Sequence, residues 1–322
     1  LLEHGAIVLH DSQRRLHLMG YVGDKVCPQG LHAAQLLGHL DIHLGVDELV
    51  EDREGIGQHR HIPVVLQLSG NLQTGGADVQ HDHIALGKDL FCRILCNIIG
   101  IADHGYSHLA FGLSREKIQE YKAECNAAAE KYGVKVLVGI ESNIRSVSGK
   151  ADLTEKDYED FDLYLCGNHI VVQYASVRDY MSYGLTNVVR GRLHMQATKR
   201  QMERNTKAYI NTIKNNPIDA ITHLNYRCPS YALEVAKSAA DYGTYLELNS
   251  KKVHLTDEEL CDIVAKTSAR FIIDSDAHSV DRIGEIKIVE EQLARVNFPL
   301  DRIDNIDGRT PAFRFAEFKK RM

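Results

Sequence analysis

The chain has 322 residues, of which 44% are hydrophobic and 25% charged, with a formal net charge of −6 at pH 7. A chain of this length and composition can bury the core of one large α/β domain or of two smaller ones. Its acidic balance and the lack of a long basic run argue against a nucleic-acid backbone as partner. We therefore look for a small-molecule function.

The cysteines and the hydropathy pattern indicate the compartment. The seven cysteines contain no C-x-x-C pair, which disfavours zinc-finger and redox motifs and fits a reducing cytosol. The sequence shows no apolar run of 18 residues and no signal-peptide pattern, so we expect no membrane partner. The expected location is cytoplasmic.

The first 97 residues differ in composition from the rest. They hold 10 of the 17 His residues, but only two of the 18 Lys and one of the 14 Tyr. They show no regular α/β pattern, although residues 31–40 could form a short helix and residues 64–68 a strand. Two interpretations stay open for residues 1–97: a fused, recombined or wrongly framed coding segment, or a variable, poorly ordered extension. The second domain is expected to cover residues 98–322.

From residue 97 onward, short apolar strands alternate with amphipathic helices, which predicts a parallel sheet with right-handed crossovers. Strands are expected at residues 97–102, 134–140, 163–166, 219–222, 244–248 and 271–273. Helices are expected at residues 115–132, 199–215, 231–242, 256–267 and 281–296, with caps at Ser114, Ser230 and Thr256. Residues 142–155 resemble an exposed loop, and the tail 298–322 resembles a polar and aromatic segment that wraps the outside.

Carboxylates and imidazoles follow the ends of five of these strands. They are His104, Glu141, His169, His223, and Asp276 together with His278. The steps of 37, 28, 54 and 53 residues between them correspond to one, one, two and two strand–helix units, since one unit takes roughly 30 residues. Because functional groups collect beyond the carboxyl ends of parallel strands, we expect these side chains to converge.

Each of these residues also has a simpler explanation on its own. A histidine can cap a turn or sit satisfied in the core, and Glu141 can pair with a lysine or arginine. Together, however, four imidazoles and two carboxylates are too costly to desolvate without cations that neutralise them. Their joint occurrence at one end of successive strands therefore favours a metal site.

The segments that carry these residues resemble the motifs of the PHP (polymerase and histidinol phosphatase) family, in its bacterial phosphatase-like branch. The motifs are residues 101–105, 139–141, 167–169, 222–225 and 274–278, and the resemblance covers about residues 98–322. It implies an α/β fold, a distorted (β/α)7 TIM-like barrel, that holds up to three divalent metals, namely Zn, Mn or Fe. It also implies hydrolysis of a small phosphorylated metabolite, a phosphate monoester, by a metal-activated water.

The resemblance assigns roles to the same side chains. It implies that the metal ligands are His104, Glu141, His169, His223, Asp276 and His278. Within this set, Glu141 is the expected bridging carboxylate, and Glu141, Asp276 and His278 are the expected catalytic residues.

One family motif is not matched. The family opens with a strand that ends in His-x-His, about one βα unit before the Asp-His motif, where this chain has Asn71 and Gln73. The nearest candidates are the pair His81 and His83, and a further pair is His59 and His61. The first βα unit of the barrel is therefore expected to be missing or replaced.

Alternatives stay open for the residues that bind substrate and for the function of the chain. Arg115 could steer an anionic substrate, and Lys251 and Lys252 could do the same, although each could simply be solvated. The expected function is a metal-dependent phosphatase or phosphoesterase. The alternative is a truncated, catalytically impaired PHP-like remnant that still binds metal. A proofreading module of a polymerase is a weaker third interpretation, because no basic groove accompanies the motifs.

Overall fold

The computed structural model describes residues 64–68, 98–132, 135–278 and 282–322. The chain divides into two compact units, Leu1–Leu49 and Val50–Met322, and every described residue belongs to the second. The helix expected at residues 31–40 and the candidate ligands His59, His61, His81 and His83 lie outside the described residues.

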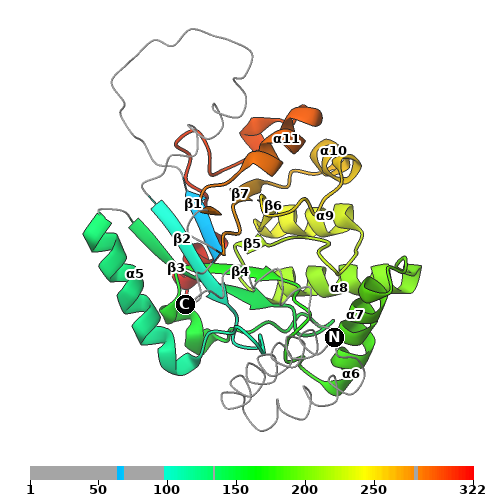
Figure 1. Cartoon of the computed structure of the whole chain (residues 1–322), viewed down its shortest axis with the longest axis horizontal. Coiled ribbons are helices and arrows are strands. Elements are labelled where there is room, and N and C mark those ends of the chain that lie inside the picture. Colours follow the sequence, from blue (N-terminus) through cyan, green and yellow to red (C-terminus); the bar gives the residue numbers. More distant parts are fainter. Residues whose placement is uncertain (1–63, 69–97, 133–134, 279–281) are drawn as a thin grey trace, which may run out of the picture. The chain divides into compact units, whose positions relative to one another are not determined.

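A seven-stranded sheet in the order β1 to β7 forms the centre of the second unit (Figure 1). The strands are β1 (Val64–Leu68), β2 (Ile98–His104), β3 (Lys135–Asn143), β4 (Leu163–Gly167), β5 (Ala220–Ile221), β6 (Tyr245–Asn249) and β7 (Phe271–Asp274). β2 to β7 are parallel, which confirms the alternation predicted from the sequence.

The first strand departs from that pattern. β1 pairs antiparallel with β2, with Val64 opposite Ala102, and it also contacts β7, so the sheet curls towards a barrel. The strand expected at residues 64–68 is thus present. Within the described residues six strands are parallel, and β1 is the antiparallel strand beside β2.

Helices α5 to α10 lie between successive strands of the sheet, and α11 and α12 follow the last strand, β7 (Figure 1). They are α5 (Ile118–Tyr132), α6 (Val177–Asp179), α7 (Leu185–Arg192), α8 (Lys199–Asn215), α9 (Ala232–Tyr242), α10 (Asp257–Lys266), α11 (Lys287–Arg295) and α12 (Arg314–Lys319). The capping box before α10 is confirmed: Glu259 N donates to Thr256 Oγ1 at 3.1 Å, and Thr256 N donates to Glu259 Oε2 at 2.9 Å. α11 begins later than expected, after a turn at Gly284.

Two of the expected caps are wrong. Ser114 makes no capping bond and donates instead to Glu116 Oε2 at 2.5 Å. Ser230 donates to Asn225 Oδ1 at 2.7 Å, and α9 begins only at Ala232. In both cases a nearby side-chain acceptor takes the serine hydroxyl, so the hydroxyl does not serve the helix terminus.

The step from His169 to His223 was expected to hold two strand–helix units, and this is wrong. The stretch from β4 to β5 is fully described and contains no strand. It contains α6, a π-helical turn (Tyr180–Gly184), α7 and α8. The step is therefore one long crossover with additional helices before α8.

Two segments expected on the outside contain buried residues. Within residues 142–155, Ile144 and Asp152 are buried, because the Asp152 carboxylate accepts the backbone N–H groups of Ser107 at 3.0 Å and Asn143 at 2.7 Å. In the tail, α12 places Phe315 in the core, edge-to-face with Tyr164 at 5.4 Å. The polar composition of both segments hid these inward-facing contacts.

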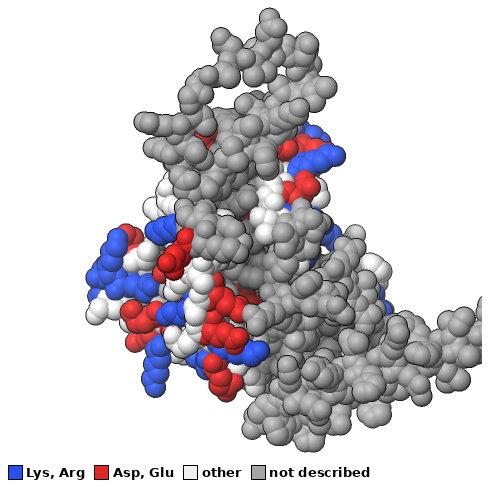
Figure 2. All heavy atoms as spheres, turned by 60° about the vertical axis from the view of Figure 1, so that its left-hand side comes forward, with Lys and Arg blue, Asp and Glu red and all other residues white. Residues whose placement is uncertain are grey.

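Charges of both signs are mixed on the described surface. Over the described part of the face in Figure 2, Lys and Arg side chains lie among Asp and Glu side chains. Among the described residues, that face therefore presents no continuous basic track for a phosphate backbone. No described helix is both long and apolar enough to cross a bilayer.

Candidate metal centre

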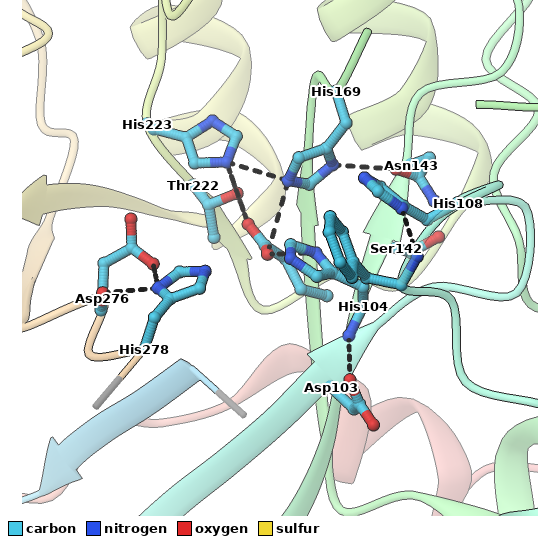
Figure 3. A network of polar contacts seen from close by, with 12 residues as sticks. Asp103, His104, His108, Ser142, Asn143, His169, Thr222, His223, Asp276 and His278 are labelled. Atoms are coloured by element: carbon cyan, nitrogen blue, oxygen red, sulfur yellow. Dashed lines mark hydrogen bonds and ion pairs between the residues drawn. The ribbon is translucent and has the colours of Figure 1, made fainter. Parts of the chain in front are cut away.

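Four of the six predicted side chains form one buried group, in which three imidazoles surround a carboxylate. Glu141 Oε2 lies 3.3 Å from His104 Nδ1 and 3.5 Å from His169 Nε2. Glu141 Oε1 lies 3.0 Å from His223 Nε2, and Figure 3 shows the three imidazoles turned towards one another. One possible ligand atom each from His104, Glu141 and His169 lies within 4.8 Å of the other two. This spacing is compatible with ligands of a single ion.

The sheet register explains why these groups meet. His104 is opposite Glu141 in the β2–β3 pairing, and His223 follows two residues after the end of β5. Gly167, the last residue of β4, permits the close approach. A Cβ at Gly167 would lie 2.2 Å from Thr222 Oγ1 and 2.5 Å from His223 Cε1. Glycine is therefore the only residue that fits there without moving His223.

Asp276 and His278 lie beside this group, after β7 (Figure 3). His278 Nδ1 is 3.4 Å from Asp276 Oδ1, and the His278 ring centroid is 5.9 Å from that of His104. Asn249 Nδ2 donates to Asp276 Oδ2 at 2.9 Å. The structure thus brings all six predicted side chains into one region at the carboxyl ends of the strands.

The two carboxylates keep their charge despite burial. Burial alone would raise the pKa of Glu141, but His169 and hydrogen bonds from the surrounding imidazoles hold that pKa well below its usual value. Burial likewise opposes ionisation of Asp276, but His278 and Lys251 lower its pKa. Charged carboxylates beside imidazoles are the ligand types that Zn²⁺, Mn²⁺ and Fe²⁺ take.

A second layer of residues, which the sequence reasoning missed, orients these ligands. Asn143 Oδ1 contacts His169 Nδ1 at 2.8 Å, which leaves His169 Nε2 facing Glu141. Thr222 Oγ1 donates to Glu141 Oε1 at 2.7 Å. The His108 ring, buried, stacks on His104 with centroids 4.8 Å apart. Only Thr222, next to a motif histidine, offered a sequence signal.

Two buried acids were also missed as site residues. Glu247 in β6 accepts the backbone N–H of His223 through Oε2, and Asp274 Oδ1 accepts the backbone N–H of Asp276 at 2.9 Å. Burial, reinforced by neighbouring acids, raises the pKa of Glu247 and of Asp274 well above the usual range. The one sequence signal for Glu247, which the sequence reasoning did not use, is an acid in the middle of an otherwise apolar strand.

The candidate substrate residues have separate places. Arg115 forms an ion pair with buried Asp157, with its second contact at 3.2 Å, and lies over the Tyr106 ring at 4.0 Å. Its contacts therefore link the 3₁₀ turn before α5 to the 3₁₀ helix Glu155–Asp160 before β4. By contrast, Lys251 Nζ lies 3.2 Å from His278 Nδ1, inside the site. The Lys252 side chain is exposed.

Comparison with known proteins gives phosphatase relatives, while no family model matches the chain. A Proteus mirabilis protein named "Probable phosphatase" is 32% identical over 185 residues, which cover 55% of this chain and 66% of that protein. The "Probable phosphatase YcdX" of Shigella flexneri is 30% identical over 187 residues, again 55% and 66%. The matched region spans only 62% to 66% of the length of three relatives named as probable phosphatases, from Proteus mirabilis, Shewanella halifaxensis and Caldanaerobacter subterraneus.

A solved structure gives a weaker likeness. The histidinol phosphate phosphatase of Lactococcus lactis, complexed with zinc, L-histidinol and phosphate, superposes with a TM-score of 0.40 at 14% identity. The match covers 66% of this chain and 84% of that chain. This score is too low to establish a common fold. The firm finding is that somewhat more than half of the chain is homologous to proteins named as phosphatases.

Proposed function

We propose that the chain is a metal-dependent phosphoesterase of the PHP type that hydrolyses a small phosphate monoester. The observation that carries this proposal is the cluster of three imidazoles around buried Glu141, with Asp276 and His278 alongside. The phosphatase-named relatives support the same reaction class. Because those relatives are longer than the matched region, activity and substrate are both part of the proposal.

The residues fit divalent metal ions. His223 Nδ1 is buried and has no hydrogen-bond partner among the described residues, and the site gathers the carboxylates of Glu141 and Asp276, which a cation would offset. We assign one ion to His104, Glu141 and His169. His223, Asp276 and His278 would hold up to two more, of Zn, Mn or Fe.

The chemistry then divides between the metal and the chain. A divalent metal held there supplies a water that is acidic enough to lose its proton near neutral pH, and it offsets charge on the phosphoryl oxygens. Thr222 and Asn143 fix the orientations of Glu141 and His169. Lys251, beside His278, adds a positive charge where the phosphate would approach, so we assign it to substrate binding.

The full chain should therefore hydrolyse an aryl phosphate monoester only when metal is present. Purified protein is expected to contain divalent metal, to lose turnover with a chelator, and to recover it when Zn²⁺ or Mn²⁺ is added. Metal content is measured by elemental analysis and turnover by release of the aryl alcohol. Turnover that survives complete metal removal would overturn the proposal. Bound metal without turnover would favour the impaired remnant.

Replacing Lys251 by Met should weaken substrate binding more than metal binding. A hydrogen bond to a charged group contributes about 1.5–3 kcal/mol, so kcat/KM is expected to fall about tenfold to a hundredfold, chiefly through KM. The matched control is Lys266→Met, because Lys266 pairs with Asp262 on the surface of α10. Steady-state kinetics with metal content measured in parallel test this. Loss of metal with unchanged KM would contradict the assignment.

A further inference from the structure

Two of the proposed ligand residues have an unfavourable backbone conformation. His223 has φ +35° and Asp276 has φ +45°, in the left-handed region that residues with a Cβ seldom adopt. Each follows the end of a strand, at the point where the chain must turn its side chain towards the site. Such a conformation persists only when the surrounding contacts impose it.

A buried carboxyl group holds the amide of each of these residues. Glu247 Oε2 accepts the N–H of His223, and Asp274 Oδ1 accepts the N–H of Asp276 at 2.9 Å. Glu247 is 4% exposed and Asp274 is 1% exposed, so water does not compete for these amides. The two contacts fix the peptide orientation just where each ligand side chain leaves the backbone.

The two carboxyl groups lie on the adjacent strands β6 and β7. Asn249 Nδ2 joins Glu247 to the site, donating to Glu247 Oε2 at 3.1 Å and to Asp276 Oδ2 at 2.9 Å. Asn249 therefore connects the acid that holds the amide of His223 to the ligand whose own amide Asp274 holds.

We propose that Glu247 and Asp274 form a carboxyl clamp, a pair of positioning residues that together hold His223 and Asp276 in their ligand orientations. The expected consequence of the clamp is higher metal affinity, and this consequence rests on the proposed function. Neither carboxyl is placed on the substrate or the metal. The clamp acts through the backbones of two ligands that follow different strands.

Side-chain amides provide a matched test of these contacts. In Glu247→Gln the amide oxygen can still accept the N–H of His223, and in Asp274→Asn it can still accept the N–H of Asp276. Glu247→Ala and Asp274→Ala remove the acceptor altogether. We therefore expect each amide variant to retain metal affinity and each alanine variant to lose part of it.

The affinity measurement uses the full chain, titrated with Zn²⁺ and with Mn²⁺ after metal removal. Loss of a residue that orients a ligand typically lowers metal affinity tenfold to a hundredfold. Glu247→Ala and Asp274→Ala are expected in that range, while Glu247→Gln and Asp274→Asn stay within about threefold of wild type. Equal losses in Glu247→Gln and Glu247→Ala would overturn the clamp.

Amide hydrogen exchange on the metal-free protein tests the clamp without reference to activity. By NMR, Glu247→Ala should speed exchange at the amide of His223, and Asp274→Ala at that of Asp276, with core amides such as that of Leu246 unchanged. Unaltered exchange at both sites would overturn the clamp. A wild-type chain that binds no metal would overturn the proposed function instead, and the exchange rates would still decide whether the clamp exists.

Discussion

Replacing Glu141 by Gln is expected to lower the affinity for a divalent metal by roughly two to four orders of magnitude and to remove phosphatase turnover. Glu141 is 2% exposed, and its two oxygens face three imidazoles within 3.5 Å. Removing one partner of a buried charged cluster costs about 3–5 kcal/mol, because the remaining groups stay buried without compensation. An amide has almost the same shape, so the effect comes from the lost charge.

Metal titration measures the affinity and aryl phosphate hydrolysis measures the turnover, both on the same protein preparations. The control is Glu234→Gln, because Glu234 is half exposed on α9 and pairs with Lys237 at 2.7 Å. It is expected to match wild type in both measurements. Thermal unfolding of metal-free protein identifies variants that fail to fold. Wild-type metal affinity in a folded Glu141→Gln protein would exclude Glu141 as a ligand and would require another metal centre.

The arrangement of the sheet was predictable because the signals are local. Short apolar runs such as that before Asp274 give strands, and alternation with helices gives parallel order. The approach of His104 to Glu141 follows from this order, since parallel neighbours in register bring their carboxyl ends to one edge. The roles of these groups as ligands stay a prediction that metal binding must test.

The residues that orient the ligands could not be found in this way. Asn143 reaches His169 across 26 positions of sequence, and Glu247 reaches the amide of His223 across 24. Both contacts depend on three-dimensional positions for which no local pattern exists. The same reason applies to the tail, where Asp219, 96 positions away in sequence, accepts the backbone N–H of buried Phe315 at 2.8 Å. A polar segment taken alone resembles a surface segment, because the residues that it contacts in the core are distant in sequence.

Asp219 should make the stability of the fold fall as the pH rises towards neutrality. It precedes β5 and is fully buried, accepting the backbone N–H groups of Phe315 in α12 and of Tyr164 in β4. Burial raises its pKa from 3.8 to about 7, so the folded state binds the proton more tightly than the unfolded chain. The stability that protonated Asp219 contributes is fully present below pH 3.8 and declines as the pH rises. It is lost once the pH has passed about 7, and stability then no longer changes through this group.

The expected size of this decline is on the order of 4 kcal/mol. Because other carboxylates add their own pH dependence, the measurement is the difference in unfolding free energy between wild type and Asp219→Asn, by urea denaturation across the range from below the pKa of 3.8 to above the pKa of about 7. The amide in Asp219→Asn cannot titrate and keeps only one acceptor oxygen, so wild type should lose its advantage over the variant as the pH rises. Asp241→Asn, an exposed change on α9, should parallel wild type. A constant difference between wild type and Asp219→Asn would show that Asp219 does not change protonation across this range.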